Sequence, residues 1–258
     1  MKDERGTNRS SLRKAECFAR TLQLAFGLIC VLWSSVALQS FWAIAPAREM
    51  TARIVANERF KRSVLVSARV ELEAWQSLSV HNASLERAKA LMGLSSFEID
   101  STPEAEHEFD ASRAGVRAAL RLNPMDSYLW LRLYSSAMLH SGVGNVNIRL
   151  LRQSYQTGPL ESWIALGRNR MALAAFPMLD DEMQDNVLSE FAHLVDSGFI
   201  DAAAASVTGA GWAYRGSLMD RLRRVDLIER EALARRLARD GIPITVPEIG
   251  IDERPWRQ

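Results

Sequence analysis

An uncharged stretch near the N-terminus constrains the fold of this chain more than any other feature. Arg20 and Arg48 bracket positions 21–47, which carry no charged side chain and are mostly apolar. A helix of about 20 apolar residues crosses the hydrocarbon core of a bilayer and satisfies its own backbone hydrogen bonds there. We therefore predict a transmembrane helix over about 22–45. Pro46 is predicted to end it, because the residue before a proline disfavours helical backbone.

Two other interpretations of this segment stay open. A buried core helix would also be uncharged, although a length of this kind is unusual in a soluble domain. A signal peptide is the second alternative, since Ala45-Pro46-Ala47 loosely resembles a small-residue cleavage site. The proline within that site and the length of the apolar run favour a retained signal anchor.

Chain length, more than charge, predicts the orientation of this anchor. Basic residues flank it on both sides: Lys2, Arg5, Arg9, Arg13, Lys14 and Arg20 before it, and Arg48, Arg53, Arg59, Lys61 and Arg62 after it. This bias is slim, but a long C-terminal domain translocates regardless of charge. We expect a cytoplasmic basic tail at 1–20, an anchor at 21–47 and a periplasmic domain at 48–258, held at a bacterial inner membrane.

Composition excludes several classes of protein. The 258 residues include 48% hydrophobic and 24% charged residues, as in an ordinary globular domain. The 32 basic and 31 acidic residues nearly balance, which argues against a nucleic-acid partner recruited by bulk charge. Two cysteines, Cys17 and Cys30, are too few for a disulfide scaffold or a four-cysteine zinc site.

The remainder of the chain is predicted to be all-α. Caps, stops and three- to four-residue apolar spacing indicate helices at about 50–79, 84–92, 101–122, 127–141, 147–156, 160–176, 180–197 and 217–239. The first of these has a predicted buried stripe of Val64, Ala68, Leu72, Trp75 and Leu78, and the last has one of Leu218, Leu222, Val225, Leu233 and Leu237. The tail 242–258 is expected to be extended or loosely docked.

A short pattern in the middle of the chain suggests a repeat. Residues 118–124 read Ala-Ala-Leu-Arg-Leu-Asn-Pro, Trp130 and Leu133 follow, and Trp163 and Leu166 repeat that Trp–Leu spacing. The pattern, over about 105–170, resembles the tetratricopeptide repeat. The resemblance implies a helical-hairpin domain with a repeat core of Leu120, Pro124, Trp130, Leu133, Trp163 and Leu166. Tyr134, Gln153 and Pro177 depart from the family pattern, and any helical-hairpin domain could offer such pairs.

The search for chemistry returns no motif. No metal-binding helix, nucleophile elbow or phosphate loop occurs, and the four histidines lack ligand spacing. We therefore expect no catalytic residue, metal or cofactor. One set of side chains is a candidate binding site, because adjacent predicted helices could bring it to one end of a concave groove: Arg149, Arg152, Arg168 and Arg170. Scattered surface arginines are the simpler alternative.

Charges of opposite sign occupy successive segments. Positions 171–214 contain acidic residues but no lysine or arginine, whereas 215–239 are rich in arginine. Either the two segments match each other within the chain, or the second presents a basic face to an anionic partner such as lipid headgroups, an acidic glycan or a protein.

The sequence thus predicts a non-catalytic, membrane-anchored helical scaffold that binds other envelope proteins, in the manner of an accessory factor of envelope or exported-polysaccharide assembly. The alternative is a glycan- or lipid-acting envelope enzyme without a recognisable motif.

Overall fold

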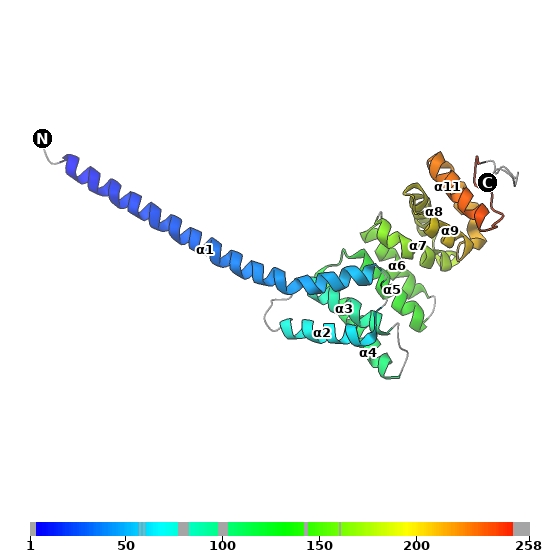
Figure 1. Ribbon diagram of the computed structural model, residues 1–258, viewed down its shortest axis with the longest axis horizontal. Coiled ribbons are helices and arrows are strands. Elements are labelled where there is room, and N and C mark those ends of the chain that lie inside the picture. Colours follow the sequence, from blue (N-terminus) through cyan, green and yellow to red (C-terminus); the bar gives the residue numbers. More distant parts are fainter. Residues whose placement is uncertain are drawn as a thin grey trace. The chain divides into compact units, whose positions relative to one another are not determined.

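The computed structural model describes residues 4–56, 58, 60–76, 83–97, 103–141, 144–159 and 161–249. Within these ranges, the description omits the side chains at 4–19, 21, 36, 37, 39–44, 73–76, 96, 97, 103–108, 140, 141, 145 and 146. Every regular element of the described residues is helical, so the all-α prediction is confirmed (Figure 1). The chain divides into two compact units, Met1–Lys89 and Ala90–Gln258, and each is considered by itself.

The first unit begins with one very long helix, α1 (Glu4–Val55), which is the blue helix of Figure 1. It passes through Pro46 without a break, so the predicted end at that proline is wrong. Proline removes one backbone donor, and a long helix can lose a single i→i−4 hydrogen bond while the bonds on both sides hold it together. The predicted anchor segment, 21–47, and the residues after it therefore belong to the same helix.

The two ends of this segment differ in burial. Between 58% and 77% of each described large apolar side chain from Leu22 to Leu38 is exposed: Leu22, Leu24, Phe26, Leu28, Ile29, Val31, Leu32, Trp33 and Leu38. Farther on, Ala47, Thr51 and Ile54 form a buried stripe at i, i+4 and i+7. Among the described residues, no helix combines the length and the hydropathy of a membrane span. The predicted span includes positions 21, 36, 37 and 39–44, whose side chains lie outside that description.

Two shorter helices follow, α2 (Arg62–Gln76) and α3 (Ala83–Phe97), and α3 crosses the boundary between the units. In α2 the buried residues are Leu65 and Leu72, and Val64 is exposed, which corrects one position of the predicted stripe. Trp75 and Leu78 lie outside the described side chains. The predicted end of α3 at Gly93 is also wrong, because this glycine is buried between Met92 and Leu94 and the packing continues the helix.

The second unit holds a run of helices: α4 (Pro103–Leu122), α5 (Ser127–Ser141), α6 (Asn145–Thr157), α7 (Ser162–Ala174), the 3-10 turn η1 (Phe176–Met178) and α8 (Asp181–Asp196). Their bounds match the predicted helices closely. The Asp180 carboxylate accepts a hydrogen bond from the Met183 N–H at 3.1 Å and caps α8. Gly198, with φ +76°, adopts the left-handed conformation that follows many helix ends.

The C-terminal part departs from the prediction. A helix that the sequence did not indicate, α9 (Ile200–Thr208), precedes η2 (Trp212–Tyr214), α10 (Arg215–Arg221), η3 (Leu222–Arg224) and α11 (Leu227–Arg239). The single helix predicted over 217–239 is therefore wrong. Its apolar stripe is nevertheless buried throughout, and the break falls where Asp226 caps α11 by accepting from the Ile228 N–H at 2.8 Å.

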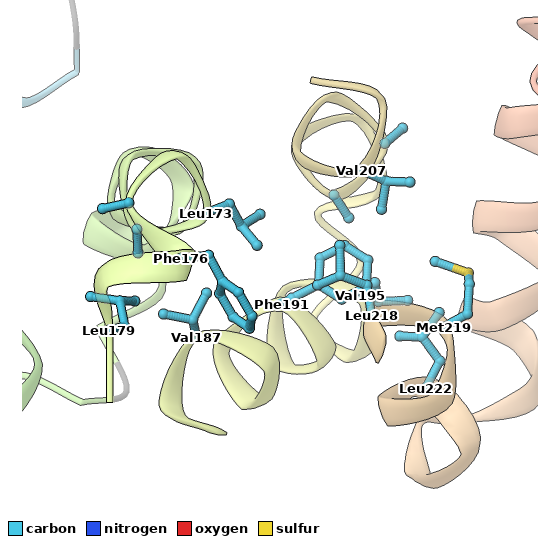
Figure 2. Close-up of a cluster of buried hydrophobic side chains, with 14 of the residues drawn as sticks. Leu173, Phe176, Leu179, Val187, Phe191, Val195, Val207, Leu218, Met219 and Leu222 are labelled. Atoms are coloured by element: carbon cyan, nitrogen blue, oxygen red, sulfur yellow. The ribbon is translucent and has the colours of Figure 1, made fainter. Parts of the chain in front are cut away.

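One apolar core joins the helices from α5 to α11. Figure 2 shows Val187, Phe191 and Val195 of α8 among Leu173 of α7 and Leu218 of α10. Ile244 and Val246 of the tail are also buried in this core, so the tail is docked up to residue 249, and 250–258 lie outside the description.

Candidate functional site

A buried polar cluster lies beside the apolar core. Its centre is Arg168 of α7, whose side chain is fully buried, with 0% exposed. The guanidinium bonds to the Glu190 carboxylate of α8: Nε donates to Oε1 at 2.8 Å, and Nη2 donates to the same oxygen at 2.6 Å. The Arg168 Cζ lies 4.1 Å from the centroid of the Tyr155 ring of α6. The cluster therefore joins three helices.

The remaining donors of Arg168 are also satisfied. Nη1 donates to the carbonyl of Ser154 at 2.7 Å and to its hydroxyl at 3.2 Å, and Nη2 donates to the carbonyl of Gly158 at 2.9 Å. These carbonyls lie at the end of α6, where helical carbonyls have few partners, and the Ser154 carbonyl also accepts from the Gly158 N–H at 3.2 Å. Because a guanidinium has five N–H donors, this set leaves none for a ligand.

The carboxylate of Glu190 is held from its other side as well. Its Oε2 accepts from the Tyr155 hydroxyl at 2.5 Å and from the Asn169 amide at 3.5 Å, and that amide also donates to the Val187 carbonyl at 2.9 Å. Burial raises the pKa of Glu190, and the charge of Arg168 opposes that shift. Burial, followed by the charge of Glu190, also raises the pKa of Tyr155. The cluster is a structural ion pair, because breaking it would leave an unpaired charge in the interior.

The arginine groove expected from the sequence does not form. Arg168 is buried, so its assignment to an exposed binding groove is wrong. Arg152 contacts the carboxylates of Asp180 and Glu182, with 3.4 Å from its Nη1 to the Glu182 Oε2. Arg149 and Arg170 are exposed. The Arg168 guanidinium is buried because it pairs with the Glu190 carboxylate of α8. The sequence of α7 alone does not indicate that this carboxylate lies next to it.

The predicted match between acidic and basic segments is confirmed in part. Asp185 of α8 pairs with Arg221 of α10, and Asp201 of α9 pairs with Arg236 of α11. Arg230, which is buried, pairs with Glu248 of the tail at 2.9 Å. The exposed Asp185–Arg221 and Asp201–Arg236 pairs stabilise the fold only slightly. They do reduce the basic charge available to an anionic partner.

Only some residues of the predicted repeat core are buried. Leu120 and Leu133 are buried, and the half-buried Trp130 donates from Nε1 to the exposed Pro124 carbonyl at 2.8 Å. By contrast, Trp163 is 44% exposed and Leu166 is 37% exposed, so their assignment as buried knobs is wrong. The inner face of α7 is occupied instead by Ile164, Ala165, Arg168, Asn169, Ala172 and Leu173.

The outer face of α7 is the strongest candidate for an interaction site. Trp163, Leu166, Gly167 and Arg170 are all exposed, at the i, i+3, i+4 and i+7 positions of one helical stripe. The Trp163 ring lies 5.1 Å from the Tyr128 ring of α5, at an interplanar angle of 44°. A partly buried tryptophan and an arginine on one helical face have the composition of a protein-binding hot spot. We refer to these four residues as the outer face.

A second polar contact adjoins this face. The Ser162 hydroxyl lies 3.4 Å from Nε2 of His193. Activation of a serine requires a closer contact and a third group that orients the histidine ring, and no carboxylate in the described part of the chain contacts His193. No group of three or more metal-ligating side chains occurs among the described residues either.

Comparison with protein families, with curated proteins and with solved structures finds no match to this chain.

Proposed function

We propose that this protein is a non-catalytic helical scaffold, anchored in the inner membrane of a bacterium by α1, with the folded units in the periplasm. The observation that carries the proposal is the exposure of nine large apolar side chains between Leu22 and Leu38. Fully burying one such side chain contributes on the order of 1.5–3 kcal/mol of favourable free energy. An exposed apolar surface of this length therefore indicates that lipid or another molecule buries it.

The sequence of this segment favours lipid over a protein partner as its surroundings. The apolar residues point in all directions around the helix, whereas a protein partner would cover one face and leave the other in water. Positions 21–47 carry no charge, and basic residues flank them on both sides. A single helix satisfies its own backbone groups in lipid, as a spanning segment must.

The buried stripe of Ala47, Thr51 and Ile54 follows the proposed span 22–45 closely. Ala47 is buried only two positions beyond Ala45, which corresponds to about 3 Å along a helix. At the end of α1, Arg53 Nε donates to Glu58 Oε2 at 2.7 Å, and its Cζ lies 4.8 Å from the Phe60 ring centroid. A helix that runs from lipid directly into packed structure holds the first unit at the membrane surface without a flexible linker.

The second unit supports a binding role over a chemical one. Its buried charges Arg168, Glu190 and Arg230 are engaged in the Arg168–Glu190 cluster and in the Arg230–Glu248 pair, and its outer face on α7 offers apolar and cationic contacts. Proteins of the envelope are the partners we propose, as for an accessory factor of envelope or exported-polysaccharide assembly. Arg149 and Arg170 are exposed and would also suit an anionic glycan or a lipid headgroup.

Alkaline carbonate extraction of the full chain from membranes tests the anchor. Wild type should stay in the membrane pellet, and its intact mass should be that of the whole chain. Leu28→Arg/Leu32→Arg should be released, because each charge at the centre of a span costs about 2.5–3.5 kcal/mol on insertion scales. Val66→Arg/Val70→Arg is the matched control, since these exposed α2 valines have the same spacing but lie outside the span.

Two results would contradict the proposal. Release of the wild-type chain by carbonate would exclude a spanning anchor. A mature product beginning near Arg48 would show that the segment is a cleaved signal peptide.

A further inference from the structure

Gly167 is a glycine for which the chain itself offers no structural reason. It lies in the middle of α7 with ordinary helical backbone, and a Cβ added there would meet no atom within 4 Å. Glycine in a helix interior is less favourable than alanine, by about 0.5–1 kcal/mol. Internal packing does not require this glycine, but the close approach of another backbone would.

The residues around Gly167 have the character of a contact surface. Trp163 and Leu166 are exposed on the same stripe, although the inner face of α7 is buried in the core. A helix that is apolar on both faces is normally buried on both. The inner face is fixed by the Arg168–Glu190 pair and the Trp163 ring contacts Tyr128, so the outer face is held in position before any partner arrives.

The outer face is also complementary to itself. Trp163 lies four residues before Gly167 and Arg170 lies three residues after it, which corresponds to about 6 Å and about 4.5 Å along the helix. If a second α7 crosses in the antiparallel direction with Gly167 at the two-fold axis, each Trp163 meets the Arg170 of the other copy. A guanidinium over an indole ring is the most favourable cation–π pair. Among the described residues, Arg170 has no acidic partner that would compete.

We propose that two copies of this chain associate through the outer faces of α7, packed antiparallel around Gly167. The interface is isologous, as in most two-fold dimers, with the glycines in backbone contact and Leu166 beside them. This proposal rests on the scaffold function proposed above, which is the reason to expect a protein on the outer face. That protein is a second copy of the chain. It does not depend on the anchor.

The test is the mass of the full chain in solution, measured by sedimentation equilibrium in detergent for four proteins: wild type, Gly167→Ala, Gly167→Leu and Gly216→Leu. Gly216 is the matched control, because it is an exposed helical glycine whose added Cβ also meets no atom within 4 Å. Wild type and Gly216→Leu should form dimers with similar dissociation constants. Gly167→Leu should raise the dissociation constant at least about tenfold, since its side chain separates the two helices.

Thermal unfolding of the same proteins distinguishes an interface from a structural role. Gly167→Ala and Gly167→Leu should not lower the melting temperature of the monomer, because both residues favour helix more than glycine does. A cysteine at the axis gives independent evidence. In a Cys17→Ser/Cys30→Ser background, Gly167→Cys should form a disulfide-linked dimer under mild oxidation, whereas Gly216→Cys should not.

Three outcomes would overturn the proposal: a wild-type chain that is monomeric at all accessible concentrations, a Gly167→Leu variant that dimerises like wild type, or a Gly167→Leu variant that unfolds. The first two would mean that the outer face has another occupant, such as an unrelated protein. Carbonate extraction is read separately, so a chain that dimerises but leaves the membrane would contradict the anchor alone.

Discussion

The two faces of α7 reverse the usual distribution of side chains. The inner face buries the guanidinium of Arg168, whereas the outer face exposes the indole of Trp163 and the side chain of Leu166. Arg168 can be buried because Glu190, the carbonyl and hydroxyl of Ser154 and the carbonyl of Gly158 accept all of its donors. Trp163 stays 44% exposed although its ring contacts that of Tyr128. The contrast teaches that a buried charge here is structural, while the exposed apolar residues are those available to a partner.

Removal of the charge of Glu190 should have the largest effect on this contrast. Glu190→Gln leaves Arg168 buried without a counter-charge, and breaking a buried pair in this way destabilises a protein by about 3–5 kcal/mol. Chemical denaturation of the variant should show a loss of this order. The double variant Arg168→Met/Glu190→Leu should recover part of it, because both charges are then gone. A wild-type free energy of unfolding for Glu190→Gln would mean that the cluster is not structural.

Truncation of two apolar residues should separate the buried part of the repeat pattern from the exposed part. Leu133→Ala removes a buried side chain and should cost about 2–5 kcal/mol. Trp163→Ala should cost the monomer much less than the 3–5 kcal/mol that is usual for a buried aromatic residue. Thermal melts under monomeric conditions measure both values. Equal losses would place Trp163 in the core and would restore the repeat assignment.

The helix boundaries and the burial of Arg168 show which parts of the structure the sequence could predict and which it could not. Local signals placed the helices well where proline, glycine and caps act on neighbouring backbone, as at Pro103, Pro124 and Gly158. They failed at α9 and at the break before α11, where the local signals are Gly198, Gly209 and the cap Asp226 and no proline interrupts the chain. Arg168 resembled Arg149 and Arg170 in the sequence. Its burial depends on Glu190, which lies on another helix, and helical spacing carries no information about that contact.

A smaller effect is expected at the cap of α8, away from both faces of α7. The Met183 N–H and the Arg152 guanidinium lower the pKa of Asp180 below its ordinary value of 3.8. The carboxylate therefore adds stability at pH values above 3.8, and that contribution is lost as the pH falls through its lowered pKa. Asp180→Asn keeps a capping side chain but does not titrate. The difference in melting temperature between wild type and this variant should be present at pH 7 and should shrink below about pH 4.

The account depends most on the claim that the outer face of α7 meets a second copy, and a double-mutant cycle between Trp163 and Arg170 tests it directly. The two residues lie two turns apart on one helix, and within one copy no contact joins their described side chains. Dimer dissociation constants of Trp163→Ala, Arg170→Ala and the double variant give their coupling energy. The account predicts a coupling of about 0.5–2 kcal/mol per Trp–Arg contact between copies. Strictly additive effects on dimerisation would contradict it.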